Sequence, residues 1–170
     1  MAEKRSLVAQ HLAGYEPEVG AALWRLQDAR GRTLELLRDV PAGMVEQETD
    51  GNAVGTILYH VALIETDWLY SEILEEPIPD DLKNLFPDED RDGAGTLTPV
   101  RGRPIEEHLA RLAAIREIFL ERLRGMTKAD FHRARTLPQY DVSPAWVLHH
   151  LAQHEAEHRA ELGSLIARER

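Results

Sequence analysis

The run His154-Glu155-Ala156-Glu157-His158 carries the clearest chemical signal in the sequence. Its two histidines are four residues apart, so on an α-helix both rings project from one face and can bind the same metal ion. The run also fits the H-E-x-x-H pattern of zinc metalloproteases, in which the glutamate is the general base. It therefore predicts either a protease or a metal site inside a helix bundle.

The other sequence features of such a protease are missing from this chain. One class of these enzymes places a glycine three residues and a histidine six residues after the second histidine, where this chain has Glu161 and Ser164. No strand pattern is present to form the sheet edge on which proteases hold a peptide. In a bundle, we expect Glu155 to pair with an arginine or to lie at an interface.

The elements that must position these residues are helices. Four long helical patterns are present, over residues 17–39, 52–74, 104–124 and from 143 nearly to the C-terminus. Asn52 and Ser143 are the expected N-cap residues of the second and fourth helices. The apolar stripe of the first helix consists of Val19, Leu23, Leu26, Leu34 and Leu37. The sequence therefore predicts an all-α protein.

A long connection, residues 75–103, separates the second helix from the third. It carries four prolines and many acidic residues, so it cannot form one regular element. A connection of this length lets the chain cross the bundle, as some four-helix bundles require. We expect a four-helix bundle with a crossover between helices two and three, in which this segment is a lid, a dimer contact or a spacer.

A third histidine is predicted to face the same interior. His60 lies in the apolar stripe of the second helix, and His154 and His158 lie about 40° apart in the stripe of the fourth. A buried imidazole needs partners for both ring nitrogens. A divalent metal ion bound by His60, His154 and His158 satisfies one nitrogen of each ring and leaves positions for water or substrate. The alternative is a set of hydrogen-bonded core histidines without an ion.

The neighbouring polar residues carry weaker signals. Glu161, three residues after His158, is the one candidate catalytic residue, because it could orient a ligand or act on a bound water. His150 is expected at the rim of the site, or as a partner of a ligand histidine. His149 is expected to point elsewhere. The histidines expected to be solvated are His11, His108 and His132.

Composition sets the broad class. The 170 residues are enough for one domain over residues 1–170, with a loosely ordered N-terminal segment at 1–14. A net charge of −10 argues against a nucleic-acid partner. No apolar stretch approaches the roughly 20 residues of a membrane span, and no secretory signal is recognised, so we expect a cytoplasmic protein without membrane contact. The chain has no cysteine, so any thiol must come from a substrate or cofactor.

Two segments resemble the DinB/YfiT-like family. Residues 56–69, Thr-Ile-Leu-Tyr-His-Val-Ala-Leu-Ile-Glu-Thr-Asp-Trp-Leu, resemble its second-helix signature, and residues 148–159, Leu-His-His-Leu-Ala-Gln-His-Glu-Ala-Glu-His-Arg, resemble its last-helix signature. The resemblance implies an up-down-down-up bundle, often a homodimer, with nickel, zinc or iron on His60, His154 and His158. Family members commonly read His-Arg-Gly-Gln where this chain has His-Arg-Ala-Glu at 158–161, which leaves the role of Glu161 open.

The resemblance also implies a function. Relatives of this fold include transferases and isomerases that use bacillithiol, mycothiol or glutathione. We therefore expect a divalent-metal-dependent transfer of a low-molecular-weight thiol, such as bacillithiol, to an electrophilic small molecule in detoxification or the stress response. A metal ion on neutral histidines keeps its full charge and lowers the pKa of a bound thiol. Two alternatives stay open: a hydrolase of small amides or esters, and a non-catalytic bundle with a structural metal site.

Overall fold

The computed structural model describes residues 7–38, 40–46 and 52–168. Of the segment 1–14 that was predicted to be loosely ordered, residues 1–6 lie outside the described residues, and residues 7–14 contain no helix or strand. Within the described residues, no helix combines the length and the apolar character needed to cross a membrane.

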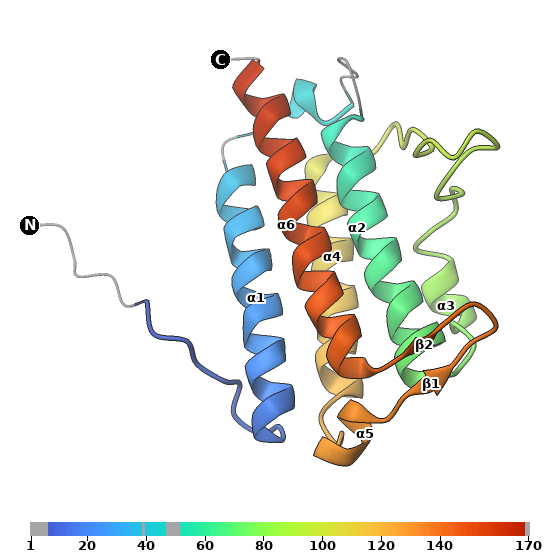
Figure 1. The fold of residues 1–170 in the computed structure, drawn as a ribbon. Helices are drawn as coiled ribbons and strands as arrows, with labels where there is room; N and C mark the ends of the chain where they lie inside the picture. The colour runs from blue at the N-terminus through green and yellow to red at the C-terminus, as the bar shows by residue number, and fades with distance from the viewer. Residues whose placement is uncertain (1–6, 39, 47–51, 169–170) are drawn as a thin grey trace, which may run out of the picture.

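In the described part of the chain, four long helices lie side by side (Figure 1). They are α1 (Pro17–Leu37), α2 (Val54–Trp68), α4 (Ile105–Arg122) and α6 (Pro144–Arg168). Helix α6 packs against both α1 and α2, and α2 also packs against α4. The predicted all-α class is confirmed.

Short elements join the long helices. They are η1 (Ala42–Met44), the π-helical segment η2 (Leu69–Leu74), α3 (Asp80–Lys83), α5 (Lys128–His132), β1 (Arg135–Thr136) and β2 (Asp141–Val142). The two strands form an antiparallel hairpin in which Arg135 lies opposite Val142. This hairpin precedes α6 and lies at the end of the molecule where α6 begins (Figure 1).

The helix starts follow local hydrogen bonding. Ser143 precedes α6 as predicted, and its hydroxyl accepts the backbone N–H of Trp146 at 3.3 Å. The predicted N-cap Asn52 is wrong, because α2 begins at Val54 and Ala53 takes the cap position. The side-chain amide of Asn52 instead donates to Glu161 Oε1 at 3.0 Å. Asn52 therefore contacts helix α6 rather than closing the first turn of α2.

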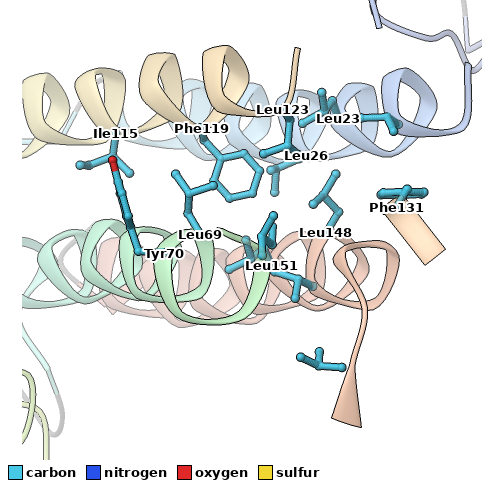
Figure 2. Packing of buried hydrophobic residues seen from close by; sticks show 14 of the residues in the cluster. Leu23, Leu26, Leu69, Tyr70, Ile115, Phe119, Leu123, Phe131, Leu148 and Leu151 are labelled. Atoms are coloured by element: carbon cyan, nitrogen blue, oxygen red, sulfur yellow. The ribbon is translucent and has the colours of Figure 1, made fainter. Parts of the chain in front are cut away.

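An apolar cluster fills the space between the long helices, as Figure 2 shows for part of it. Its members include Leu23, Leu26, Leu69, Phe119, Leu148 and Leu151. Burying each such side chain stabilises the fold by about 1.5–3 kcal/mol. Leu34, which was predicted to belong to the apolar stripe of the first helix, is 43% exposed. The prediction is wrong there because the buried positions of that part of α1 are taken by polar residues, Arg30 and Thr33.

The connection 75–103 contains α3 and otherwise no helix, in agreement with its prolines. It runs beside α2 (Figure 1) and is attached to it by the buried Tyr59. The Tyr59 hydroxyl donates to the carbonyl oxygen of Asp88 at 2.8 Å and accepts the Asp88 N–H at 2.9 Å. These two bonds hold the backbone of the connection against α2, two residues before Asp90.

Candidate metal centre

The structure brings His60 of α2 together with His154 and His158 of α6. Each ring offers one nitrogen, and these nitrogens all lie within 4.8 Å of one another. The ring centroid of His60 is 5.1 Å from that of His154 and 5.0 Å from that of His158. The two α6 rings have centroids 4.5 Å apart, as expected for side chains separated by about one helical turn. This group can hold a metal ion.

The spacing of the nitrogens suits a shared ion. His60 Nε2 and His154 Nε2 are 3.2 Å apart. Two nitrogens bound to one tetrahedral ion at about 2.0–2.1 Å are themselves about 3.3–3.4 Å apart. The donor set of three imidazoles also fits zinc, nickel or iron, which accept imidazole readily. The residues present therefore fit a divalent transition-metal ion.

Carboxylates lie behind two of the three rings. Asp90 Oδ1 is 2.6 Å from His60 Nδ1, and Glu161 Oε2 is 3.0 Å from His158 Nδ1. Because an ionised carboxylate only accepts hydrogen bonds, the Nδ1 atom of each ring carries the proton and Nε2 keeps its lone pair. A carboxylate in this place orients a metal-binding histidine and increases its basicity. Both rings are thus fixed with Nε2 available as the ligand atom.

Burial keeps two of the rings neutral. Desolvation lowers the pKa of His60, although its bond to Asp90 works in the opposite direction. Desolvation also lowers the pKa of His154 to about 3, with a further contribution from the charges that His158 and His60 would carry. Histidine binds metal ions only in its neutral form. Both side chains are therefore in the form that binds metal at neutral pH.

The site is open on the side of α6. His60 is 3% exposed, whereas the side chain of His158 is 18% exposed. A separate hollow of about 340 Å³ is bounded in part by Leu63, Phe86 and Asp90. The triad is therefore buried on the α2 side, at His60, and partly exposed on the α6 side, at His154 and His158.

Glu161 has both of its oxygens engaged. Oε2 accepts from His158, and Oε1 accepts from the amide of Asn52 at 3.0 Å. Because it contacts Nδ1, Glu161 lies behind the His158 ring and away from the nitrogen that keeps its lone pair. This arrangement suits a residue that orients a ligand better than one that acts on a bound water.

Glu155 points away from the histidines. It is 2% exposed and accepts hydrogen bonds from Arg30 Nε at 2.6 Å and from Arg116 Nη2 at 3.3 Å. Glu65 bridges the same two guanidinium groups, with 2.8 Å between Arg30 Nη2 and Glu65 Oε2. The prediction that Glu155 pairs with an arginine is confirmed. These four residues, hereafter the buried ion cluster, come from α1, α2, α4 and α6, one from each.

One part of the site, and one ion cluster outside it, were not predicted from the sequence. Asp90 lies in an irregular connection, thirty positions from His60, and its only signal is that it belongs to an acidic run. The buried ion cluster was also missed, although Arg30 lies at helical spacing from Leu26 and Glu65 follows an apolar run. A charged residue on an apolar face is the signal that could have indicated a buried partner.

The remaining histidines divide into three kinds. His11 and His132 are exposed as predicted, and His132 contacts Glu18. His150 is half-buried, with its ring centroid 5.9 Å from that of His154. His108, predicted to be solvated, is 1% exposed. That prediction is wrong because α4 packs closely on α2 at Gly55, where a Cβ atom would lie 2.8 Å from His108 Nε2.

Comparison with known protein families gives a match that covers most of the chain. The family model of the DinB superfamily matches residues 25–162, which is well over half of the chain and includes all three histidines of the triad. No curated protein matches the chain.

Proposed function

The chain belongs to the DinB superfamily, and on this premise we propose that it is a divalent-metal-dependent transferase of low-molecular-weight thiols. In this proposal His60, His154 and His158 are the metal ligands, and nickel, zinc or iron is the ion. The observation that carries it is the convergence of three ring nitrogens within 4.8 Å, with carboxylates behind two of the rings.

A divalent ion in this site would supply Lewis-acid chemistry, lowering the pKa of a thiol so that it is a thiolate at neutral pH. The residues of the chain prepare that chemistry. His60 and His154 are uncharged at neutral pH, so both can bind the ion, and neutral imidazole ligands leave the charge of the ion in place. Asp90 and Glu161 hold two of the rings in one orientation, and the exposed edge at His158 admits the thiol.

The proposed reaction balances without a redox partner. The thiol proton leaves to solvent, the sulfur forms a bond to an electrophilic carbon, and the displaced electron pair departs with a leaving group or takes up a proton. The chain contains no cysteine. Its own side chains therefore offer no thiol that would compete with the co-substrate for the ion or for the electrophile.

Turnover with defined thiols tests the proposal. Protein purified without a histidine tag is loaded with nickel, zinc or iron and assayed with bacillithiol, mycothiol and glutathione against alkyl halides and epoxides. We expect metal-dependent product formation that His60→Ala abolishes and the exposed control His149→Ala retains. Absence of turnover above the His60→Ala level, with metal content verified, would overturn the proposal.

A second measurement separates a catalytic ion from a structural one. In the cobalt-substituted protein, a free coordination position should bind azide or imidazole and shift the visible spectrum. An unchanged spectrum at saturating azide would favour a structural ion, even if metal raises the melting temperature.

The proposal extends to the architecture and setting of the protein. We take the bundle to have the up-down-down-up order, residues 1–170 to be a single domain, and the protein to act as a cytoplasmic homodimer on a small-molecule substrate. Light scattering on the purified protein tests the dimer, since a mass of 19.3 kDa in solution would indicate a monomer.

A further inference from the structure

A second group of aromatic side chains lies where the β1–β2 hairpin meets α2 and α6. The rings of Trp68 and Tyr140 are close to parallel, with centroids 6.4 Å apart, and Trp146 is 5.4 Å from Trp68. Tyr140 is 44% exposed and Trp146 is 49% exposed. Exposed aromatic surface gathered in one place is typical of a ligand site.

These rings border a hollow of about 560 Å³. Its other walls are formed by the hairpin and the residues around it, namely His132, Ala134, Asp141, Val142 and Ser143. Small-molecule sites commonly have volumes of about 300–1,000 Å³ and are lined mainly by apolar and aromatic groups. The hollow therefore has the size and lining of a small-molecule site.

Carboxylates lie at and behind the walls of the hollow. The Tyr140 hydroxyl donates to Glu72 Oε1 at 2.9 Å, which places a carboxylate behind one aromatic wall. Asp141 lines the hollow, and Asp67 is close enough to raise the pKa of both Tyr140 and Glu72. The residues described as lining the hollow include no lysine or arginine, and the histidine among them, His132, is bonded to Glu18.

Glu72 has an unused oxygen. The residue is 5% exposed, and its Oε2 atom is buried with no hydrogen-bond partner among the described residues. Burial raises the pKa of Glu72, because a desolvated carboxylate without a counter-charge is unfavourable. A cation brought into the neighbouring hollow would supply the missing positive charge.

We propose that the hollow bordered by Trp68, Tyr140 and Trp146 binds a small organic cation with an alkylated ammonium group. Aromatic faces attract such ions through their quadrupoles, and methylated ammonium groups lose little hydration when they enter an aromatic site. The acidic groups behind the rings favour a cation over a neutral or anionic molecule of the same shape.

This site is distinct from the histidine triad. Trp68 follows His60 by eight residues on α2, which corresponds to about 12 Å along the helix axis. His150 lies between the two places, with its ring 4.6 Å from Trp68 and 5.9 Å from His154. The proposed cation site therefore goes beyond the proposed transferase activity and needs no metal ion.

Binding of three probes of similar size tests the proposal. Benzyltrimethylammonium, benzyl alcohol and benzoate are titrated into the full chain carrying Trp24→Phe, so that Trp68 and Trp146 are the remaining fluorescent reporters. We expect saturable binding of the cation about tenfold tighter than that of the alcohol, and no binding of benzoate. Equal affinity for the cation and the alcohol, or no change in fluorescence with any probe, would overturn the proposal.

Variants separate the contributions of rings and charge. Trp146→Leu, at a half-exposed position, should weaken binding of the cation at least severalfold, measured by calorimetry. Glu72→Gln should weaken binding of the cation and leave the affinity for benzyl alcohol unchanged. His60→Ala should bind the cation as the parent does. A Glu72→Gln protein that is folded by circular dichroism and binds the cation with parent affinity would refute the charge argument, and loss of binding in His60→Ala would refute a separate site.

Discussion

Replacing Glu155 by glutamine separates the two interpretations of the H-E-x-x-H run. In a protease this glutamate would be the general base, so the substitution would remove activity and leave the fold intact. In the structure Glu155 belongs to the buried ion cluster and lies away from the triad. We therefore expect Glu155→Gln to lower the stability of the fold and to leave the number of metal ions bound per chain unchanged.

The magnitude follows from the burial of the cluster. The side chains of Arg30, Arg116, Glu65 and Glu155 are 3–6% exposed, so water does not screen their charges. Two guanidinium groups balance two carboxylates, and the substitution leaves one positive charge without a counter-charge. Removing one partner from a buried ion pair lowers the free energy of unfolding by about 3–5 kcal/mol. For a chain of this size, that lowers the melting temperature by about 6–20 °C.

Thermal unfolding followed by circular dichroism measures the effect, and elemental analysis below the transition measures metal content. The matched control is Glu157→Gln on the exposed face of α6, where the carboxylate accepts a hydrogen bond from Gln153, and its effect should stay within about 0.5 kcal/mol. The double variant Arg30→Gln/Glu155→Gln restores neutrality and should lose less stability than the sum of its single variants. A Glu155→Gln protein with parental melting temperature and no bound metal would refute this reasoning.

Three further predictions follow from the site and its surroundings. Asp90→Asn should weaken zinc binding about 10–100-fold in competition with a chromogenic chelator, because Asp90 orients His60, whereas Glu89→Gln should not. Zinc at about 100 times its dissociation constant should raise the free energy of unfolding by about 2.7 kcal/mol over chelator-treated protein, measured by denaturant titration. The free energy of unfolding of the metal-free protein should fall as the pH drops from about 6.5 towards 4. Burial lowers the pKa of His108 to about 4 in the folded protein, so in this pH range the unfolded chain binds a proton at His108 that the folded chain does not. His108→Gln should reduce the dependence of the free energy of unfolding on pH.

For each of these three predictions, one outcome would contradict it. Equal zinc affinity in Asp90→Asn and the parent would show that the connection does not support the site. Identical unfolding curves with zinc and with chelator would mean that the folded chain has no preferential affinity for the ion. A slope between pH 6.5 and 4 that is unchanged in His108→Gln would assign the acid sensitivity to other groups.

Most of the helical framework was predictable because helix periodicity is a local property. The stripe of α6 indicated the inward faces of His154 and His158, and the position of His60 between Ile57 and Ile64 indicated the third histidine. Local patterns failed where packing overrides them. Leu34 has the spacing of a core residue and is exposed, whereas His108 has no apolar signal and is buried against Gly55.

The sequence by itself determined that this protein is helical, that it has no thiol of its own, and that three histidines face one interior. Only the tertiary structure decided what lies behind and beside those histidines. Asp90 reaches His60 from an irregular connection, and Glu155 meets Arg30 across 125 positions of sequence. The aromatic hollow forms where a hairpin folds over the end of α2. The physical reason is that a periodic pattern depends on neighbours within a few residues, whereas these contacts exist only after separate helices have packed against one another.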